Sequence, residues 1–125
     1  MSNESNPVIW FEIPVDDLDR ASKFYAHVFG VAFEEQSMGE TQMAFFPMLK
    51  DAGGATGTLA KGEGYAPCES GTLIYFTTPD IDAALARASE RGGKTLTAKT
   101  AIGEYGYIGI MQDSEGNRIG LHSMT

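Results

Sequence analysis

The sequence contains an internal repeat with an offset of 63 residues. Aligned without gaps, the two halves share residues at helix starts, helix ends and hairpin turns: Asp17/Asp80, Asp19/Asp82, Ala21/Ala84, Gly30/Gly93, Met48/Met111, Gly53/Gly116 and Gly57/Gly120. The locations of these identical pairs are stronger evidence for a repeat than their number, because Asp favours helix N-caps and Gly favours helix ends and tight turns. The repeat predicts two modules with one order of elements: strand, helix and three strands (βαβββ).

Hydrophobic patterning supports this order in the first half. Residues 7–15 are mostly apolar, β-branched or aromatic, which predicts a strand. Asp16 or Asp17 can then cap a helix that ends at Gly30, with apolar residues at helical spacing at Leu18, Ala21, Tyr25 and Val28. Three strand-like runs follow at 31–36, 42–48 and 55–60.

The second half repeats the pattern with a strand at 72–78, a cap at Asp80 and a helix stop at 92–93. Residues 61–70 contain Gly62, Gly64 and Pro67 and are typical of a linker. We therefore expect one domain over 1–125, with module one at about 7–60, the linker at about 61–70 and module two at about 71–124.

Module size determines the expected fold class. A half of this length, with one helix and a four-stranded sheet, leaves one sheet face exposed unless something covers it. The two sheets must therefore come together around a concave space. The sequence predicts an α+β fold in which two βαβββ modules form an eight-stranded, half-open, barrel-like cavity.

Charge and cysteine content limit the classes of partner. The formal net charge is -8, which repels nucleic acids and anionic membrane surfaces, so we expect neither as a partner. Cys68 is the single cysteine, as a reducing compartment permits, and no apolar run approaches the roughly 18 residues of a membrane span. Residues 1–6 are polar and unlike a secretion signal. These features predict a cytoplasmic protein.

Two segments carry a resemblance to a known family. They are residues 11–21, followed by Phe24-Tyr25 and Phe29-Gly30, and residues 113–121. With the doubled βαβββ pattern, they resemble the glyoxalase, bleomycin-resistance and extradiol-dioxygenase superfamily, also called the vicinal-oxygen-chelate fold. The resemblance covers nearly the whole chain and implies this fold. It also implies a homodimer, since members of this length are commonly two-fold dimers.

The resemblance also implies four positions for metal ligands, on the first and last strand of each module. In this sequence they are Trp10, Leu73, Gly57 and Gly120, and none of these can bind a metal. We therefore expect no metal and no cofactor. Trp10 and Leu73 either fill the core or wall a metal-free pocket in which the two glycines leave room for a planar ligand. The pocket is the favoured interpretation.

Strand alternation extends the inward face by steps of two residues. It adds the polar side chains of Glu12, Tyr75, Arg118 and His122, which could converge. Glu12, His122 and Tyr75 form a possible acid/base set, although Arg118 could pair with an acid at the rim and His122 could be a solvated strand end. Tyr105 and Tyr107, in the loop 103–107, either contact a ligand or only pack.

Three functions remain open from the sequence. The first is a metal-independent protein that binds an aromatic or otherwise apolar small molecule, as sequestering resistance proteins of the family do. The second is a glyoxalase-like lyase or isomerase. It would use Glu12, His122 and Tyr75, or a metal bound by residues that the sequence does not identify. The third is a dimer or accessory subunit without a ligand.

Overall fold

The computed structural model describes residues 6–125, in which each half of the chain forms one βαβββ module. The first module has the sheet order β1-β4-β3-β2, with β1 and β4 parallel and the other neighbours antiparallel. Its elements are β1 (Trp10–Pro14), α1 (Leu18–Phe29), β2 (Glu34–Met38), β3 (Thr41–Phe45) and β4 (Thr56–Lys61). Residues 1–5, which belong to the polar N-terminal segment 1–6 considered above, lie outside the described part of the chain.

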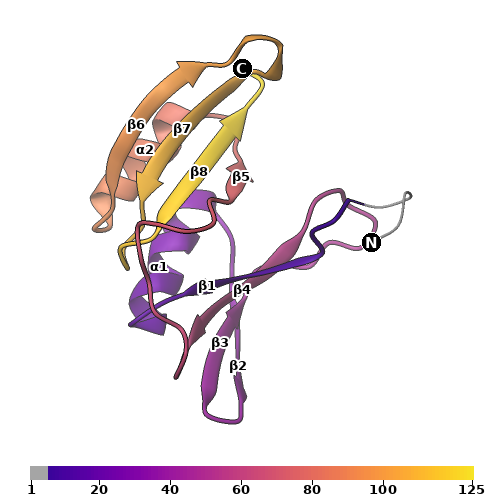
Figure 1. The fold of residues 1–125 in the computed structure, drawn as a ribbon, viewed down its shortest axis with the longest axis vertical. Coiled ribbons are helices and arrows are strands. Elements are labelled where there is room, and N and C mark those ends of the chain that lie inside the picture. The colour runs from indigo at the N-terminus through magenta and orange to yellow at the C-terminus, as the bar shows by residue number, and fades with distance from the viewer. Residues whose placement is uncertain (1–5) are drawn as a thin grey trace.

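The second module repeats this topology with the order β5-β8-β7-β6. Its elements are β5 (Tyr75–Thr77), α2 (Ile81–Glu90), β6 (Lys94–Ala101), the 3₁₀ helix η1 (Gly103–Tyr105), β7 (Tyr107–Gln112) and β8 (Arg118–Ser123). The two sheets lie side by side with the helices against them, a half-open arrangement (Figure 1). The predicted α+β class and the doubled βαβββ order are confirmed.

The predicted element ends are close to those observed, and the differences have local causes. Asp17 caps α1 by accepting from Arg20 N–H, and Asp80 caps α2 by accepting from Ala83 N–H. Gly30 ends α1 in the left-handed conformation, as predicted. By contrast, β3 ends at Phe45 rather than residue 48, where Pro47 has no N–H to donate to a ladder.

Aromatic packing between the helices and sheets forms the core. Phe11 of β1 and Phe76 of β5 have ring centroids 5.6 Å apart, so the core is continuous across the modules. Tyr25 of α1 is fully buried and packs edge-on against Phe24 and Phe46. Phe11 and Phe76 lie on the faces of their strands that are turned toward the helices, which leaves the opposite face of each sheet outside the core.

The turn between β7 and β8 clamps the second module to the start of α1. The buried Glu115 carboxylate accepts hydrogen bonds from the backbone N–H groups of Asp16 and Asp17, both at 2.9 Å. It also pairs with the Arg20 guanidinium, with Nε to Oε2 at 2.7 Å. Burial alone would raise the pKa of Glu115, but Arg20, these N–H groups and the Ser114 hydroxyl outweigh it and lower the pKa to about 2.

A second layer of hydrogen bonds lies beneath the clamp. Tyr25 donates its hydroxyl proton to Asp113 at 2.6 Å, and burial, followed by the Asp113 charge, raises the pKa of Tyr25. Asp113 accepts from the backbone N–H groups of Glu115 and Asn117. Asn117 in turn donates to the carbonyl of Pro14 in β1. One turn of the second module therefore fixes both the strand end and the helix start of the first.

We predict that Glu115→Gln lowers the free energy of unfolding by about 2–3 kcal/mol at neutral pH, because it removes a buried charge-assisted contact. The folded-state pKa lies below the ordinary value of 4.5, so this stabilisation is present above about pH 4.5 and is lost as the pH falls toward 2. Urea unfolding of both proteins between pH 7 and pH 2 measures the difference, which should shrink on acidification.

Asp19→Asn is the matched control, because Asp19 pairs with Lys23 on the exposed surface of α1. It should change stability by less than about 0.5 kcal/mol. Equal effects of the two substitutions would contradict the role given to the clamp.

Candidate functional site

The candidate site lies on the outer faces, defined as the face of each sheet turned away from the helices. Pairing register assigns the residues, because partners on neighbouring strands point to the same side. Across the first sheet, one row runs Glu34, Phe45, Thr58 and Glu12, on β2, β3, β4 and β1 respectively. Trp10 and Thr56 lie opposite each other in the neighbouring row.

Trp10 and Phe45 form an aromatic pair over β4. Their ring centroids are 5.9 Å apart with planes inclined by 58°. Strands β1 and β3 flank β4, so the rings lean toward each other across the middle strand. Trp10 is 38% exposed, so part of its ring is accessible on the outer face.

Glu12 lies beside this pair and is exposed. Tyr65 of the linker donates its hydroxyl proton to Glu12 Oε1 at 2.9 Å, and this hydrogen bond raises the pKa of Tyr65. Within residues 6–125 no group donates to the second carboxylate oxygen, Oε2. Glu12 can therefore accept a further hydrogen bond or pair with a cation.

Thr58 lies in the middle of the row and is fully buried. Its hydroxyl oxygen has no hydrogen-bond partner among the described residues. A buried hydroxyl without a partner is unfavourable, and such groups are uncommon in folded proteins. A hydrogen-bond donor that reached this point of the outer face would satisfy it.

The outer face of the second sheet holds the predicted residues of module two. Tyr75 pairs with Gly120, and a Cβ at Gly120 would lie 2.4 Å from the Tyr75 ring, so the close contact requires glycine. His122 Nε2 lies 2.6 Å from the Tyr105 carbonyl oxygen, so Nε2 carries the proton. Arg118 shares this face at the start of β8, while Tyr105 lies in η1 near His122, at the other end of the strand, and is 68% exposed.

The structure corrects two placements. Gly57 pairs with Phe11, not Trp10, and lies on the helix side, where a Cβ would be 2.0 Å from the Phe11 carbonyl oxygen. The expectation that Gly57 shares the face of Trp10 was wrong, because a shift of one residue along a strand turns the side chain to the opposite face. Tyr107 also lies on the helix side, packed against the core with the Lys99 ammonium 4.6 Å from its ring centre. Leu73 is half-buried and precedes β5.

The predicted acid/base groups are not brought together within one chain. Glu12 is bonded to Tyr65 and His122 to Tyr105, on different sheets. No hydrogen bond or ion pair in the described residues joins Glu12 to Tyr75, Arg118 or His122. The acid/base hypothesis therefore requires a ligand or a second copy to connect them.

The side chains at the expected ligand positions, Trp10, Leu73, Gly57 and Gly120, do not fit a metal ion. The residues that pair with two of them in the sheets add only the hydroxyl of Thr56, opposite Trp10, and the phenol of Tyr75, opposite Gly120. In the part of the chain that the structure describes, no three His, Cys, Asp or Glu side chains form a cluster that could hold a metal.

Sequence reasoning missed Phe45, Thr58 and Tyr65 as site residues. Phe45 and Phe46 are adjacent, so alternation could not tell which one faces outward. Thr58 was missed because the alternation that turned Gly57 toward the expected cavity turns its neighbour Thr58 away from it. Tyr65 lies in the linker, where no periodic pattern marks a facing side chain.

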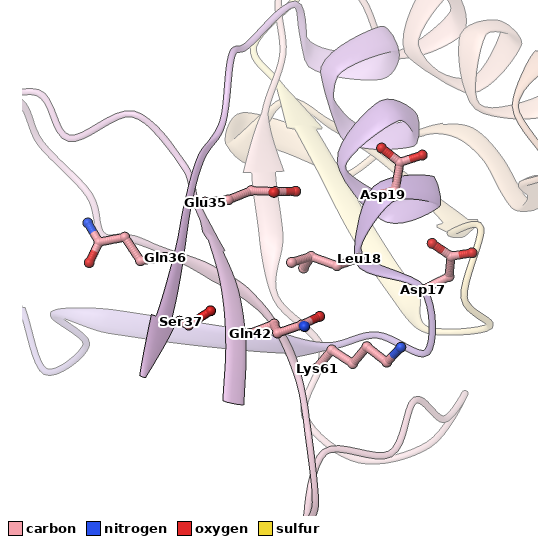
Figure 2. Close-up of a pocket in the computed structure, with 8 residues that line it drawn as sticks. All are labelled: Asp17, Leu18, Asp19, Glu35, Gln36, Ser37, Gln42 and Lys61. Atoms are coloured by element: carbon pink, nitrogen blue, oxygen red, sulfur yellow. The ribbon is translucent and has the colours of Figure 1, made fainter. Parts of the chain in front are cut away.

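A separate cleft of about 560 Å³ lies on the helix side of the first sheet, against the start of α1 (Figure 2). Its polar lining includes Asp17, Asp19, Glu35 and Lys61. None of the predicted site residues line it, so it is distinct from the outer faces.

Comparison with known proteins agrees with this fold. The family model for the Glyoxalase/Bleomycin resistance protein/Dioxygenase superfamily matches residues 8–121. A glyoxylase-like domain-containing protein from Didymella fabae is 30% identical over 110 residues, covering 85% of this chain and 84% of that protein. The chain belongs to this superfamily, as its sequence pattern predicted.

Solved structures resemble the chain over nearly its whole length. TnmS3, an antibiotic binding protein from Streptomyces sp. CB03234, has a TM-score of 0.67 at 25% identity, covering 96% of this chain and 97% of that one. A glyoxalase/bleomycin resistance protein from Albidiferax ferrireducens T118 has a TM-score of 0.70 at 18% identity, covering 94% and 98%. Glyoxalase I from Zea mays has a TM-score of 0.68 at 20% identity. This chain spans 46% of the maize protein, and 94% of this chain is covered.

We predict that Trp10→Ala lowers the free energy of unfolding by about 1 kcal/mol, because the ring is partly exposed. The fully buried Phe24→Ala variant should lose about 3–5 kcal/mol through the cavity it leaves. Urea midpoints of the two variants give the comparison. A loss at Trp10 as large as that at Phe24 would show that Trp10 serves the core.

Proposed function

We propose that this protein is a metal-independent small-molecule-binding member of the superfamily, which holds an aromatic or apolar ligand on its outer faces. The exposed Trp10–Phe45 pair, beside a carboxylate and above a buried hydroxyl, is the observation that carries the proposal. Flat aromatic surfaces with a few polar groups are typical of ligand sites. The likeness to TnmS3, described as an antibiotic binding protein, supports the same interpretation. Tyr75, Arg118 and His122 would contribute from the second sheet.

A lyase or isomerase of the same fold is the second candidate. The Nε2 proton of His122 is held by the Tyr105 carbonyl, which leaves Nδ1 with a free lone pair to act as a base. Such a reaction would require Glu12 and Tyr75 to contact the same ligand as His122. Catalysis that depends on His122 and Glu12 would favour this candidate over simple binding.

We also propose a homodimer that completes the site. Among the strand residues described, the outer face of the first sheet carries Glu12 and Glu34 and no Lys or Arg. That of the second sheet carries Arg118 and Lys94 and no Asp or Glu. In a two-fold dimer, the first sheet of each copy would face the second sheet of the other, so that an acidic face and a basic face lie on opposite sides of the ligand at two equal sites.

Exposed apolar side chains at one end of the first sheet fit this assembly. Val8 and Ile9 precede Trp10, while Met48 and Leu49 lie in the connection between β3 and β4. These side chains are 60–81% exposed. A second copy would cover them.

The exposed thiol of Cys68, the single cysteine, suits the proposed cytoplasmic location, where thiols stay reduced.

Binding is tested by a thermal-shift screen of aromatic metabolites on protein dialysed against a chelator, with elemental analysis of the same sample. A ligand at about a hundredfold above its Kd should raise stability by about 2.7 kcal/mol, and Trp10→Ala should weaken its binding by about 1–3 kcal/mol. Near-stoichiometric zinc, nickel, manganese or iron, required for binding, would contradict the proposal.

The dimer is tested by light scattering across micromolar concentrations. We expect twice the subunit mass, and Arg118→Glu should raise the dissociation constant at least about tenfold, because a negative charge would then face the acidic first sheet of the other copy. Lys61→Glu, which makes the same charge reversal on the helix side, is the control. One subunit mass at all concentrations, or equal effects of the two variants, would argue against this assembly.

A further inference from the structure

The geometry of the first sheet points to a particular ligand class: an aromatic molecule that carries a protonated amine. We propose that the row Glu34–Phe45–Thr58–Glu12, with Trp10 beside it, selects for this positive charge. The inference rests on the proposed function, since it specifies which small molecules that site takes. It assigns the aromatic body to the rings and the ammonium group to Glu12 and Thr58.

The aromatic part of the ligand has a defined place. Trp10 and Phe45 lean over β4 with planes inclined by 58°, so a flat ring can pack against either face. The same rings attract a cation held near them, because the face of an aromatic ring is electron-rich. An anion would meet the opposite effect.

The charged groups on this face are all acidic. Glu12 has one oxygen bonded to Tyr65 and the other without a donor from residues 6–125. Glu34 lies at the far end of the same row and is exposed. Because the strand residues described here place no Lys or Arg on this face, an ammonium group would be the strongest available partner for Glu12.

Thr58 supplies an independent observation. Its side chain shares the face of Glu12 and Phe45, is fully buried, and has a hydroxyl oxygen without a partner in the described chain. An ammonium group offers three N–H donors, enough to bond Glu12 and the Thr58 oxygen together. Since Trp10 and Phe45 lean over this strand, they must part for the amine to reach Thr58.

The test uses three probes with one aromatic body: 2-naphthylmethylamine, 2-naphthylmethanol and 2-naphthoate. Calorimetry at pH 7 and low salt should show the amine binding at least about tenfold more tightly than the alcohol, with the carboxylate weakest. Glu12→Gln should bring the amine and the alcohol within about threefold of each other, while the alcohol's affinity stays unchanged. Glu40→Gln, which removes the same charge from the exposed turn between β2 and β3, should keep the preference.

Thr58→Val separates a ligand role from a structural one. Replacing an unpartnered hydroxyl with a methyl group should preserve or increase the urea midpoint. We expect it to lower the affinity for the amine severalfold nonetheless. A variant that gains stability and binds the amine normally would remove Thr58 from the site.

The outcomes distinguish this inference from the proposed function. If the alcohol or the carboxylate binds as tightly as the amine, the charge preference is wrong and aromatic binding stands. The unchanged protein could bind amine and alcohol equally, while the Arg118→Gln variant prefers the amine. Arg118 of a second copy would then already neutralise Glu12, and this result also overturns the inference. If none of the three probes binds while the screen of aromatic metabolites finds a ligand, this inference fails and the proposed function stands. If neither experiment shows binding, both proposals fail.

Discussion

The carboxylate of Glu115 is the contact on which the arrangement of the two modules depends. It comes from a turn of the second module, yet its partners are two backbone N–H groups and an arginine at the start of α1. The N-terminus of a helix presents unpaired donors and a positive dipole end, so a buried carboxylate is well satisfied there. In the same turn, Asp113 accepts a hydrogen bond from Tyr25 of α1, and Asn117 donates one to the Pro14 carbonyl of β1. The turn therefore holds α1 and β1 of the first module against the second module.

The two modules use their equivalent turns differently. The turn between β7 and β8 is largely buried against the first module, whereas in the connection between β3 and β4 only Phe46 is buried and residues 47–55 are all exposed. A repeat in sequence has therefore become an asymmetric structure, with a docked turn on one side and an exposed apolar segment on the other. The aromatic and acidic outer face of the first sheet lies next to this exposed segment, where a ligand or a second copy can reach it.

The fold was predictable because its signals are local. Asp17, Asp80 and Gly30 act through hydrogen bonds and dihedral angles within a few residues, and each occupies the expected position. Site prediction was less complete. In module two, alternation placed Tyr75, Gly120 and His122 on one face, as observed. In module one, the same method turned Gly57 the wrong way, because the phase of β4 is set by the ten-residue connection from β3, residues 46–55, whose path is not encoded by alternation.

The sequence alone determined the doubled βαβββ order, the helix limits, the superfamily and the absence of ligating side chains at Trp10, Leu73, Gly57 and Gly120. These follow from residue identity and short-range geometry. Only the tertiary structure decided that Glu12 bonds Tyr65, that Thr58 is buried without a partner between Glu12 and Phe45, and that Tyr107 belongs to the core. These features depend on residues that are distant in the chain. Strand register and packing bring those residues together, and no local sequence pattern specifies either.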